Sequence, residues 1–136
     1  MGLDIGGSHT RGVLFHGQTP VREARSGSAN VQNVPAEQAR ACLASVLFEL
    51  GAPPTTPVVA GSGGVDTPHD AARLAGLIRS AGSLDPSARV MAVHDTRLIL
   101  AAGGHTSGIA LIAGTGSVAW GVDCLLYTSD AADDTR

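Results

Sequence analysis

The chain has 136 residues, of which 43% are hydrophobic and only 3% aromatic, and its formal net charge is −3. This length suits one modest domain whose core must be filled by Ala, Val, Leu and Ile. The negative charge and the absence of a Lys/Arg cluster argue against a nucleic-acid groove.

The N-terminal residues and the cysteines indicate the compartment and the kind of protein. Asp4, His9 and Arg11 come early and no long apolar run follows, so we expect neither a signal peptide nor a membrane span. Cys42 and Cys124 form no CxxC pair, and the five histidines show no ligand spacing. These features predict reduced thiols, a cytoplasmic protein and no histidine metal site.

The first half of the chain predicts three strands and a helix. The strands cover residues 1–5, 11–16 and 19–25, and a polar loop runs from Ser26 to Val34. Pro35 opens a helix that continues through Leu50, because proline is favoured at the first helical position. Apolar residues at helical spacing form its expected buried stripe, Leu43, Val46, Leu47 and Leu50.

The second half predicts helices that alternate with strands. A strand at 57–60 leads into a glycine-rich loop, and Thr67 caps a helix with the stripe Ala71, Leu74, Leu77 and Ile78. A strand at 89–93 and a helix at 95–102 follow. A strand, a turn and a strand then occupy the segment from Gly108 to Val122.

The order βββαβαβα predicts an α/β fold with a mixed sheet. Three consecutive strands are typical of an antiparallel meander, and alternating strands and helices are typical of parallel crossover units. We expect helices on the faces of this sheet. The hairpin after Ser107 repeats the opening pattern, which indicates the start of a second, similar domain.

Two glycine-rich turns are the most informative motifs. One lies in residues 3–10, Leu-Asp-Ile-Gly-Gly-Ser-His-Thr, and the other in residues 109–117, Ile-Ala-Leu-Ile-Ala-Gly-Thr-Gly-Ser. Glycines let the backbone approach a ligand and expose consecutive N–H groups that hold anions. Either turn alone is typical of a tight hairpin. The presence of both turns, with Asp4 in the first, predicts that the two turns together bind one polyphosphate.

The element order and the turns resemble the actin-like, or hexokinase-like, ATPase superfamily, which is built from two ribonuclease-H-like domains. Residues 4–10 look like its first phosphate loop, 113–117 like its second, and 93–95 like the segment with the catalytic aspartate. The Gly-Thr-Gly-Ser form of the second loop, together with residues 27–30, is most similar to the N-acetylglucosamine kinase and BadF/BadG group. The resemblance covers roughly residues 1–122.

The resemblance implies an ATP-dependent kinase that acts on an amino sugar such as N-acetylglucosamine or glucosamine, with ATP and Mg²⁺ as cofactors. Asp95 would be the general base and would also contact the substrate, with Asn30, Gly63 and Gly64. Asp4 would hold Mg²⁺ directly or through water. The implied phosphate-binding residues are Gly6, Gly7, Ser8, Thr10, Gly114, Thr115, Gly116 and Ser117.

Each implied residue also has a plain structural role to weigh against its functional one. Asp95 could cap its helix, and Asn30 could simply occupy a turn. Gly63 and Gly64 are equally typical of turns. His94 stands where the family often has Asn, and we expect it to pack or cap rather than act in catalysis.

Three alternatives bear on function. The run Gly-Thr-Gly-Ser-Val-Ala at 114–119 fits a dinucleotide fingerprint, but it leads into an alternating strand pattern and not into a helix. A BadF-type ATPase activator of a dehydratase or reductase would need cluster-binding cysteines, which Cys42 and Cys124 do not resemble. A ROK-type sugar kinase shares the first loop but often carries a cysteine-rich zinc motif, which this sequence lacks.

The domain prediction follows from the repeated hairpin. We expect an N-terminal ribonuclease-H-like domain at 1–106, the start of a truncated second domain at 107–123, and a tail at 124–136 that departs from the family. A fragment of this kind is expected to be inactive alone. The expected partners are a sugar and ATP, without nucleic acid or membrane, and a homodimer is left open.

Overall fold

The computed structural model describes residues 1–113, 117–122 and 128–130. Contacts divide the chain into two compact units, Met1–Asp95 and Thr96–Arg136, which are described separately below. The predicted boundary at residue 107 falls inside the second unit, and the domain assignment stays a prediction. Among the described helices, none combines the length and apolar character needed to cross a membrane.

The first unit is built on a five-stranded mixed sheet in the order β3-β2-β1-β4-β5. Strand β1 pairs antiparallel with β2 and parallel with β4, while β2–β3 is antiparallel and β4–β5 parallel. The predicted mixed α/β class is therefore confirmed. The strands are β1 Gly2–Ile5, β2 His9–His16, β3 Thr19–Gly27, β4 Val58–Ser62 and β5 Val90–Val93.

Three strands run further than the sequence predicts, because pairing with a neighbour carries them into the turns. Strands β2 and β3 pair from His9 opposite Gly27 to His16 opposite Thr19, so both cover residues expected in loops. Strand β4 continues to Ser62, which pairs with Ile5 at the end of β1. The carboxyl ends of β1 and β4 therefore meet at one edge of the sheet.

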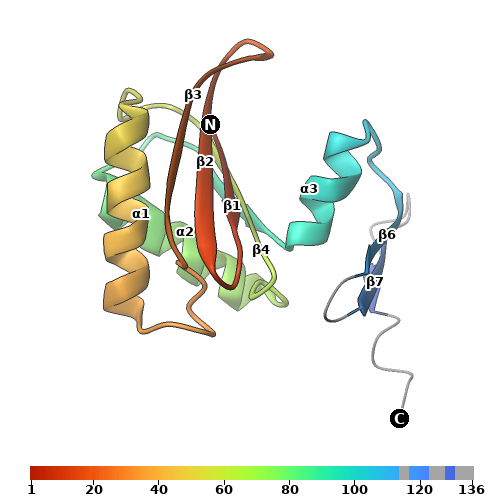
Figure 1. Ribbon diagram of the computed structural model, residues 1–136. Coiled ribbons are helices and arrows are strands. Elements are labelled where there is room, and N and C mark those ends of the chain that lie inside the picture. The colour runs from red at the N-terminus through yellow and green to blue at the C-terminus, as the bar shows by residue number, and fades with distance from the viewer. Residues whose placement is uncertain (114–116, 123–127, 131–136) are drawn as a thin grey trace. The chain divides into compact units, whose positions relative to one another are not determined.

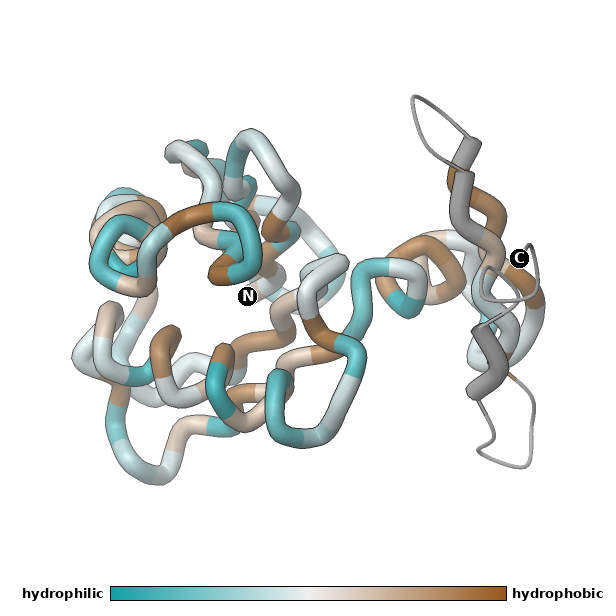
Figure 2. Tube along the Cα trace, turned by 90° about the horizontal axis from the view of Figure 1, so that it is seen from below, coloured by the Kyte–Doolittle hydropathy of each residue, from teal (hydrophilic) through white to brown (hydrophobic). Residues whose placement is uncertain are grey.

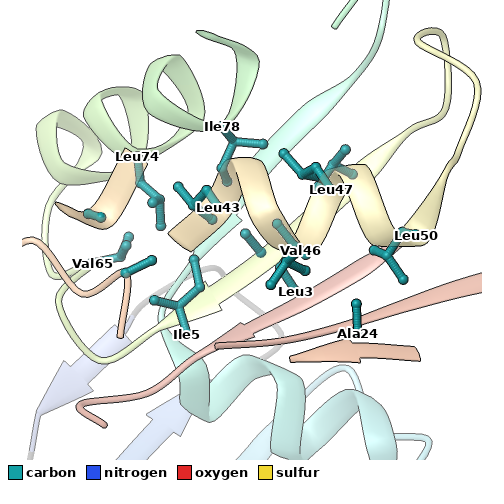
Figure 3. Close-up of a cluster of buried hydrophobic side chains, with 14 residues drawn as sticks. Leu3, Ile5, Ala24, Leu43, Val46, Leu47, Leu50, Val65, Leu74 and Ile78 are labelled. Carbon is teal, nitrogen blue, oxygen red and sulfur yellow. The ribbon is translucent and has the colours of Figure 1, made fainter. Parts of the chain in front are cut away.

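Two helices pack on the same face of this sheet, α1 Ala36–Leu50 and α2 Pro68–Gly82 (Figure 1). The expectation of helices on both faces is not met within this unit. The predicted α1 stripe is buried throughout, whereas in α2 only Leu74 and Ile78 are fully buried. Leu3 and Ile5 of β1 face the helices and Asp4 between them is exposed, as strand alternation requires. Figure 3 shows these side chains gathered in one core.

One glycine makes the close packing of α1 on the sheet possible. A Cβ on Gly12 of β2 would lie 2.5 Å from Val46 Cγ1 and 2.9 Å from Leu50 Cδ1. In Figure 2 brown apolar residues recur along the helices and strands of this unit, and the loops between them are mostly teal or pale. The first unit therefore has a closely packed, apolar interface between α1 and the sheet.

The helix ends follow the sequence closely. Thr67 accepts a hydrogen bond from the Asp70 N–H, and the Asp70 side chain accepts one from the Thr67 N–H, which completes a capping box. Gly51 ends α1 in the left-handed conformation, at φ 58°. Pro35 differs slightly from the prediction, because it occupies the N-cap and the helix begins at Ala36.

The second unit contains α3 Asp95–Ala102, which begins at the last residue of the first unit, and three antiparallel strands. Strand β6 Gly108–Ala113 pairs with β7 Ser117–Val122, and β7 pairs with β8 Thr128–Asp130. Leu100, Ala110 and Val122 form a small buried cluster with Trp120 packed on it. That this hairpin opens a second domain stays a prediction.

Candidate active site

The first glycine-rich turn joins β1 to β2 at residues 6–8. The Gly6 N–H donates to the His9 carbonyl over 3.0 Å, which closes the turn. Gly7 and Ser8 are exposed, and a Cβ on Gly7 would lie 3.1 Å from Asn33 Nδ2. The turn is thus open to solvent at Gly7 and Ser8, two of the four residues here that are expected to meet phosphate.

Hydrogen bonds connect this turn to the segment after β3. The Ser28 hydroxyl donates to the Gly6 carbonyl over 2.9 Å, and the Ala29 N–H donates to Thr10 Oγ1 over 3.1 Å. Thr10 is fully buried, so its hydroxyl is used within the fold. The phosphate role assigned to Thr10 stays a prediction, while its observed role is to fix the strand to the 28–30 segment.

Asn30 and Gly64 are brought together, although 34 positions separate them in the sequence. Asn30 is 9% exposed, and its Oδ1 accepts the Gln32 N–H over 3.0 Å. A Cβ on Gly64 would lie 2.8 Å from that oxygen. The Gln32 amide also donates to the Gly64 carbonyl over 3.4 Å. The two loops therefore fit against each other only because residue 64 has no side chain.

Asp95 lies against the neighbouring glycine. A Cβ on Gly63 would be 3.2 Å from Asp95 Oδ2. The other oxygen, Oδ1, lies 3.0 Å from His94 Nδ1, and His94 Nε2 lies 3.7 Å from Asp66 Oδ1. Asn30, Gly63, Gly64 and Asp95, the four predicted substrate residues, thus form one continuous group, joined through Ser28 to the first glycine turn.

Asp4 projects from the sheet face opposite the helices, in register with Arg11. Glu23 binds the Arg11 guanidinium through two hydrogen bonds of 2.9 and 2.8 Å, and Arg25 Nε also donates to Glu23 over 2.9 Å. The bond from Arg11 and then that from Arg25 lower the pKa of Glu23 to about 2, and its carboxylate raises the pKa of Arg11. The arrangement holds Arg11 on Glu23, beside Asp4.

The predicted metal ligand Asp4 and the two cysteines are considered next. Across residues 1–113, 117–122 and 128–130, no three His, Cys, Asp or Glu side chains gather as a metal-binding group. Asp4 is therefore a single carboxylate, not part of a cage. Cys42 of α1 is a half-buried free thiol beside Gly27, and Cys124 lies outside the described residues.

Most of the second phosphate turn also lies outside the described residues. These are Gly114, Thr115 and Gly116. Ser117 begins β7 and pairs with Ala113 across the hairpin. The strands on either side of the turn are therefore present, and the roles predicted for 114–117 stay predictions.

Three residues without a predicted site role also contact the predicted site residues. Ser28 and Gln32 connect the loops around Asn30, and His94 touches the predicted base. A Ser and a Gln within a polar loop are too common to stand out. The pattern Val-His-Asp at the end of a strand was a usable signal for His94, since adjacent imidazole and carboxylate groups often interact.

Two solved structures are similar to nearly the whole chain. One, from Porphyromonas gingivalis, has a TM-score of 0.75 and 21% sequence identity over 95% of this chain. The other, from Chromobacterium violaceum, has a TM-score of 0.65 and 26% identity over 96% of this chain. Both proteins are provisionally named N-acetylglucosamine kinases. The chain shares their fold.

The predicted resemblance to N-acetylglucosamine kinases is confirmed by this likeness. The chain spans 46% and 47% of the two proteins, so less than half of each. No protein-family model matches the sequence, and no curated protein sequence matches it.

Proposed function

We propose that this chain forms the first part of an ATP-dependent kinase that phosphorylates a hydroxyl of an amino sugar, such as N-acetylglucosamine or glucosamine. The observation that carries the proposal is the convergence of Asn30, Gly63, Gly64 and Asp95 from three separate segments. The two similar structures, both provisionally named N-acetylglucosamine kinases, support it.

The sugar would be held by groups that the fold leaves available. Asn30 Oδ1 already accepts the Gln32 N–H, and Asn30 Nδ2 donates to none of the described residues. That amide can therefore donate to a sugar hydroxyl or an N-acetyl oxygen. Gly63 leaves space beside Asp95 for the hydroxyl that is to be phosphorylated.

Asp95 would act as the general base. It would accept the proton of the attacking hydroxyl as the γ-phosphoryl group arrives, which is the usual task of a carboxylate in this reaction class. Its position after β5 is where ligands collect in sheets of this kind. The second use of Asp95, as the first residue of α3, is compatible with this role.

The first glycine turn would hold phosphate through the exposed Gly7 N–H and the hydroxyl of Ser8, while Gly6, whose N–H closes the turn, would let the phosphate come close to the backbone. Asp4 suits Mg²⁺, which takes one or two carboxylates and otherwise keeps water and phosphate ligands. When bound, Mg²⁺ would neutralise charge on the nucleotide phosphates. We also propose that residues 114–117 bind the nucleotide phosphates. We also propose a cytoplasmic location.

Phosphoryl transfer is the test of the proposed function. We expect a chain extended to the length of the two similar structures to transfer phosphate from Mg-ATP to N-acetylglucosamine, and Asp95→Asn to lower kcat by roughly 10²–10⁴-fold. The sugar Kd of the variant should stay close to that of the unchanged protein. Near-normal turnover of Asp95→Asn would leave Asp95 as a helix cap.

Iron analysis distinguishes the kinase from a BadF-type activator. The activator would hold an iron–sulfur cluster on cysteine thiolates. We expect purified, extended protein to contain no stoichiometric iron and to phosphorylate sugar. Bound iron together with ATP hydrolysis that no sugar stimulates would favour the activator.

A further inference from the structure

The side chain of Asn33 lies beside the first glycine turn, on the side of Gly7 that would carry a Cβ. A Cβ at Gly7 would be 3.1 Å from Asn33 Nδ2. Gly7 does not adopt the left-handed backbone conformation, so its φ angle does not require glycine at this position. What favours glycine here is the nearness of the Asn33 amide, which a side chain at residue 7 would push aside.

Hydrogen bonds hold Asn33 at this place. The Asn33 N–H donates to the Asn30 carbonyl over 2.9 Å. Two residues before Asn30, the Ser28 hydroxyl donates to the Gly6 carbonyl over 2.9 Å. The segment that carries Asn33 is therefore bound to the glycine turn itself, and the amide stays beside Gly7.

Hydrogen-bond donors around Gly7 are unused within the part of the chain that the structure describes. The side-chain amide of Asn33, the Gly7 N–H and the Ser8 hydroxyl donate to none of the described residues. All three residues are exposed. Such donors suit an anion with several oxygens, because hydrogen bonds to an ionised phosphate are shorter and stronger than those between neutral groups.

We propose that Asn33 is a phosphate-binding residue, whose Nδ2 donates to an oxygen of the nucleotide phosphate held by the Gly7 N–H and the Ser8 hydroxyl. The inference rests on the proposed function for the identity of the nucleotide. Asn30 and Asn33 belong to one hydrogen-bonded turn. That turn would therefore bind both substrates, the sugar through Asn30 and the phosphate through Asn33.

Side-chain amide resonances of the ¹⁵N-labelled 136-residue chain test this without a variant. The probe is inorganic triphosphate with Mg²⁺, which offers phosphate oxygens without a nucleoside or a sugar. We expect saturable shifts at the Asn33 side-chain amide and the Gly7 backbone amide. The exposed side chain of Gln18 is the internal control and should not shift, because strand β2 separates it from the glycine turn. Saturable shifts that leave Asn33 unmoved, or no saturable binding, would overturn the proposal.

Two substitutions test whether Asn33 acts as a donor. Asn33→Ala removes the amide, and Asn33→Asp keeps the size of the side chain but replaces the donor by a carboxylate that repels phosphate. We expect the Kd for triphosphate to rise about three- to tenfold in Asn33→Ala and further in Asn33→Asp. Gln18→Glu makes the same change of charge at the far end of β2 and should leave the Kd within about twofold. An unchanged Kd in Asn33→Asp would contradict the proposal.

Kinetics of the extended protein separate this inference from the proposed function. If triphosphate shifts Asn33 and Gly7 but the extended protein phosphorylates no amino sugar, the proposed function fails and Asn33 stands as a phosphate-binding residue. If the extended protein phosphorylates N-acetylglucosamine and Asn33→Asp leaves its KM for Mg-ATP unchanged, the role of Asn33 is wrong and the kinase proposal is unaffected.

Discussion

Asn30 and Gly64 are in contact across two loops, and the contact leaves no room for a side chain at residue 64. A Cβ there would lie 2.8 Å from Asn30 Oδ1 and 3.2 Å from Gln32 Cγ. Gly64 is buried, and its N–H donates to Ser62 Oγ over 3.3 Å. The position of the Asn30 side chain therefore depends on a glycine in another segment.

We predict that Gly64→Ala lowers both stability and sugar binding. The added methyl group would displace Asn30 or shift the loop, and overpacking of this kind costs about 1–3 kcal/mol. Urea denaturation measures the first effect and a titration with N-acetylglucosamine the second. Gly76→Ala in α2 is the control, because a Cβ there meets no atom within 4 Å and alanine favours the helix by up to about 1 kcal/mol. An unchanged sugar affinity in Gly64→Ala would separate the contact from binding.

Gly12→Ala should destabilise the first unit without touching the site. Its Cβ would collide with Val46 Cγ1 and Leu50 Cδ1 in the interface between α1 and β2. The expected loss is about 1–3 kcal/mol, or more if α1 cannot shift. Thermal unfolding followed by circular dichroism measures it. A melting temperature equal to that of the unchanged chain would mean that α1 is not packed on the sheet in this way.

Glu23 should make a pH-dependent contribution to stability. Its pKa is about 2 in the folded chain, below the ordinary 4.5, mainly because Arg11 and Arg25 donate to it. A lowered pKa means a stabilising contribution that is complete above 4.5 and is lost as the pH falls toward 2. The difference in unfolding free energy between the unchanged chain and Glu23→Gln should shrink over this range, and also in high salt. A difference that stays constant with pH would contradict the ion pairs.

Asp4→Ala should weaken the use of Mg-ATP more than the binding of sugar. Asp4 is exposed on the sheet, so the substitution should change stability by no more than about 0.5 kcal/mol. In the extended protein, the Mg²⁺ concentration that gives half-maximal activity should rise. If activity depends on Mg²⁺ as before, the metal lies elsewhere.

Local patterns made most of the first unit predictable. Leu43, Val46, Leu47 and Leu50 recur at helical spacing and are buried, and Thr67 with Asp70 forms the predicted start of α2. These features depend on residues a few positions apart. The same is true of the hydrogen-bonded turn at residues 6–9, which Gly6 and Gly7 predict.

Contacts between residues far apart in the chain could not be predicted from local sequence patterns. Nothing near Thr10 indicates that its hydroxyl accepts the Ala29 N–H, because that partner lies 19 positions away. The burial of Asp95 Oδ1 beside His94 depends likewise on how β5 ends against the loop that carries Asp66. Strand ends are a further case, because pairing with β1, not composition, extends β4 beyond the predicted end at Ala60 to Ser62.

Chemical-shift mapping can test whether the proposed sugar site lies at Asn30, Gly63 and Gly64. The ¹⁵N-labelled 136-residue chain is titrated with N-acetylglucosamine, with glycerol as a control for weak polyol effects. We expect saturable shifts at the amides of these three residues and none at Gly17 or Gly51, which lie in other turns. Shifts that do not saturate, or that fall outside the three residues, would contradict it.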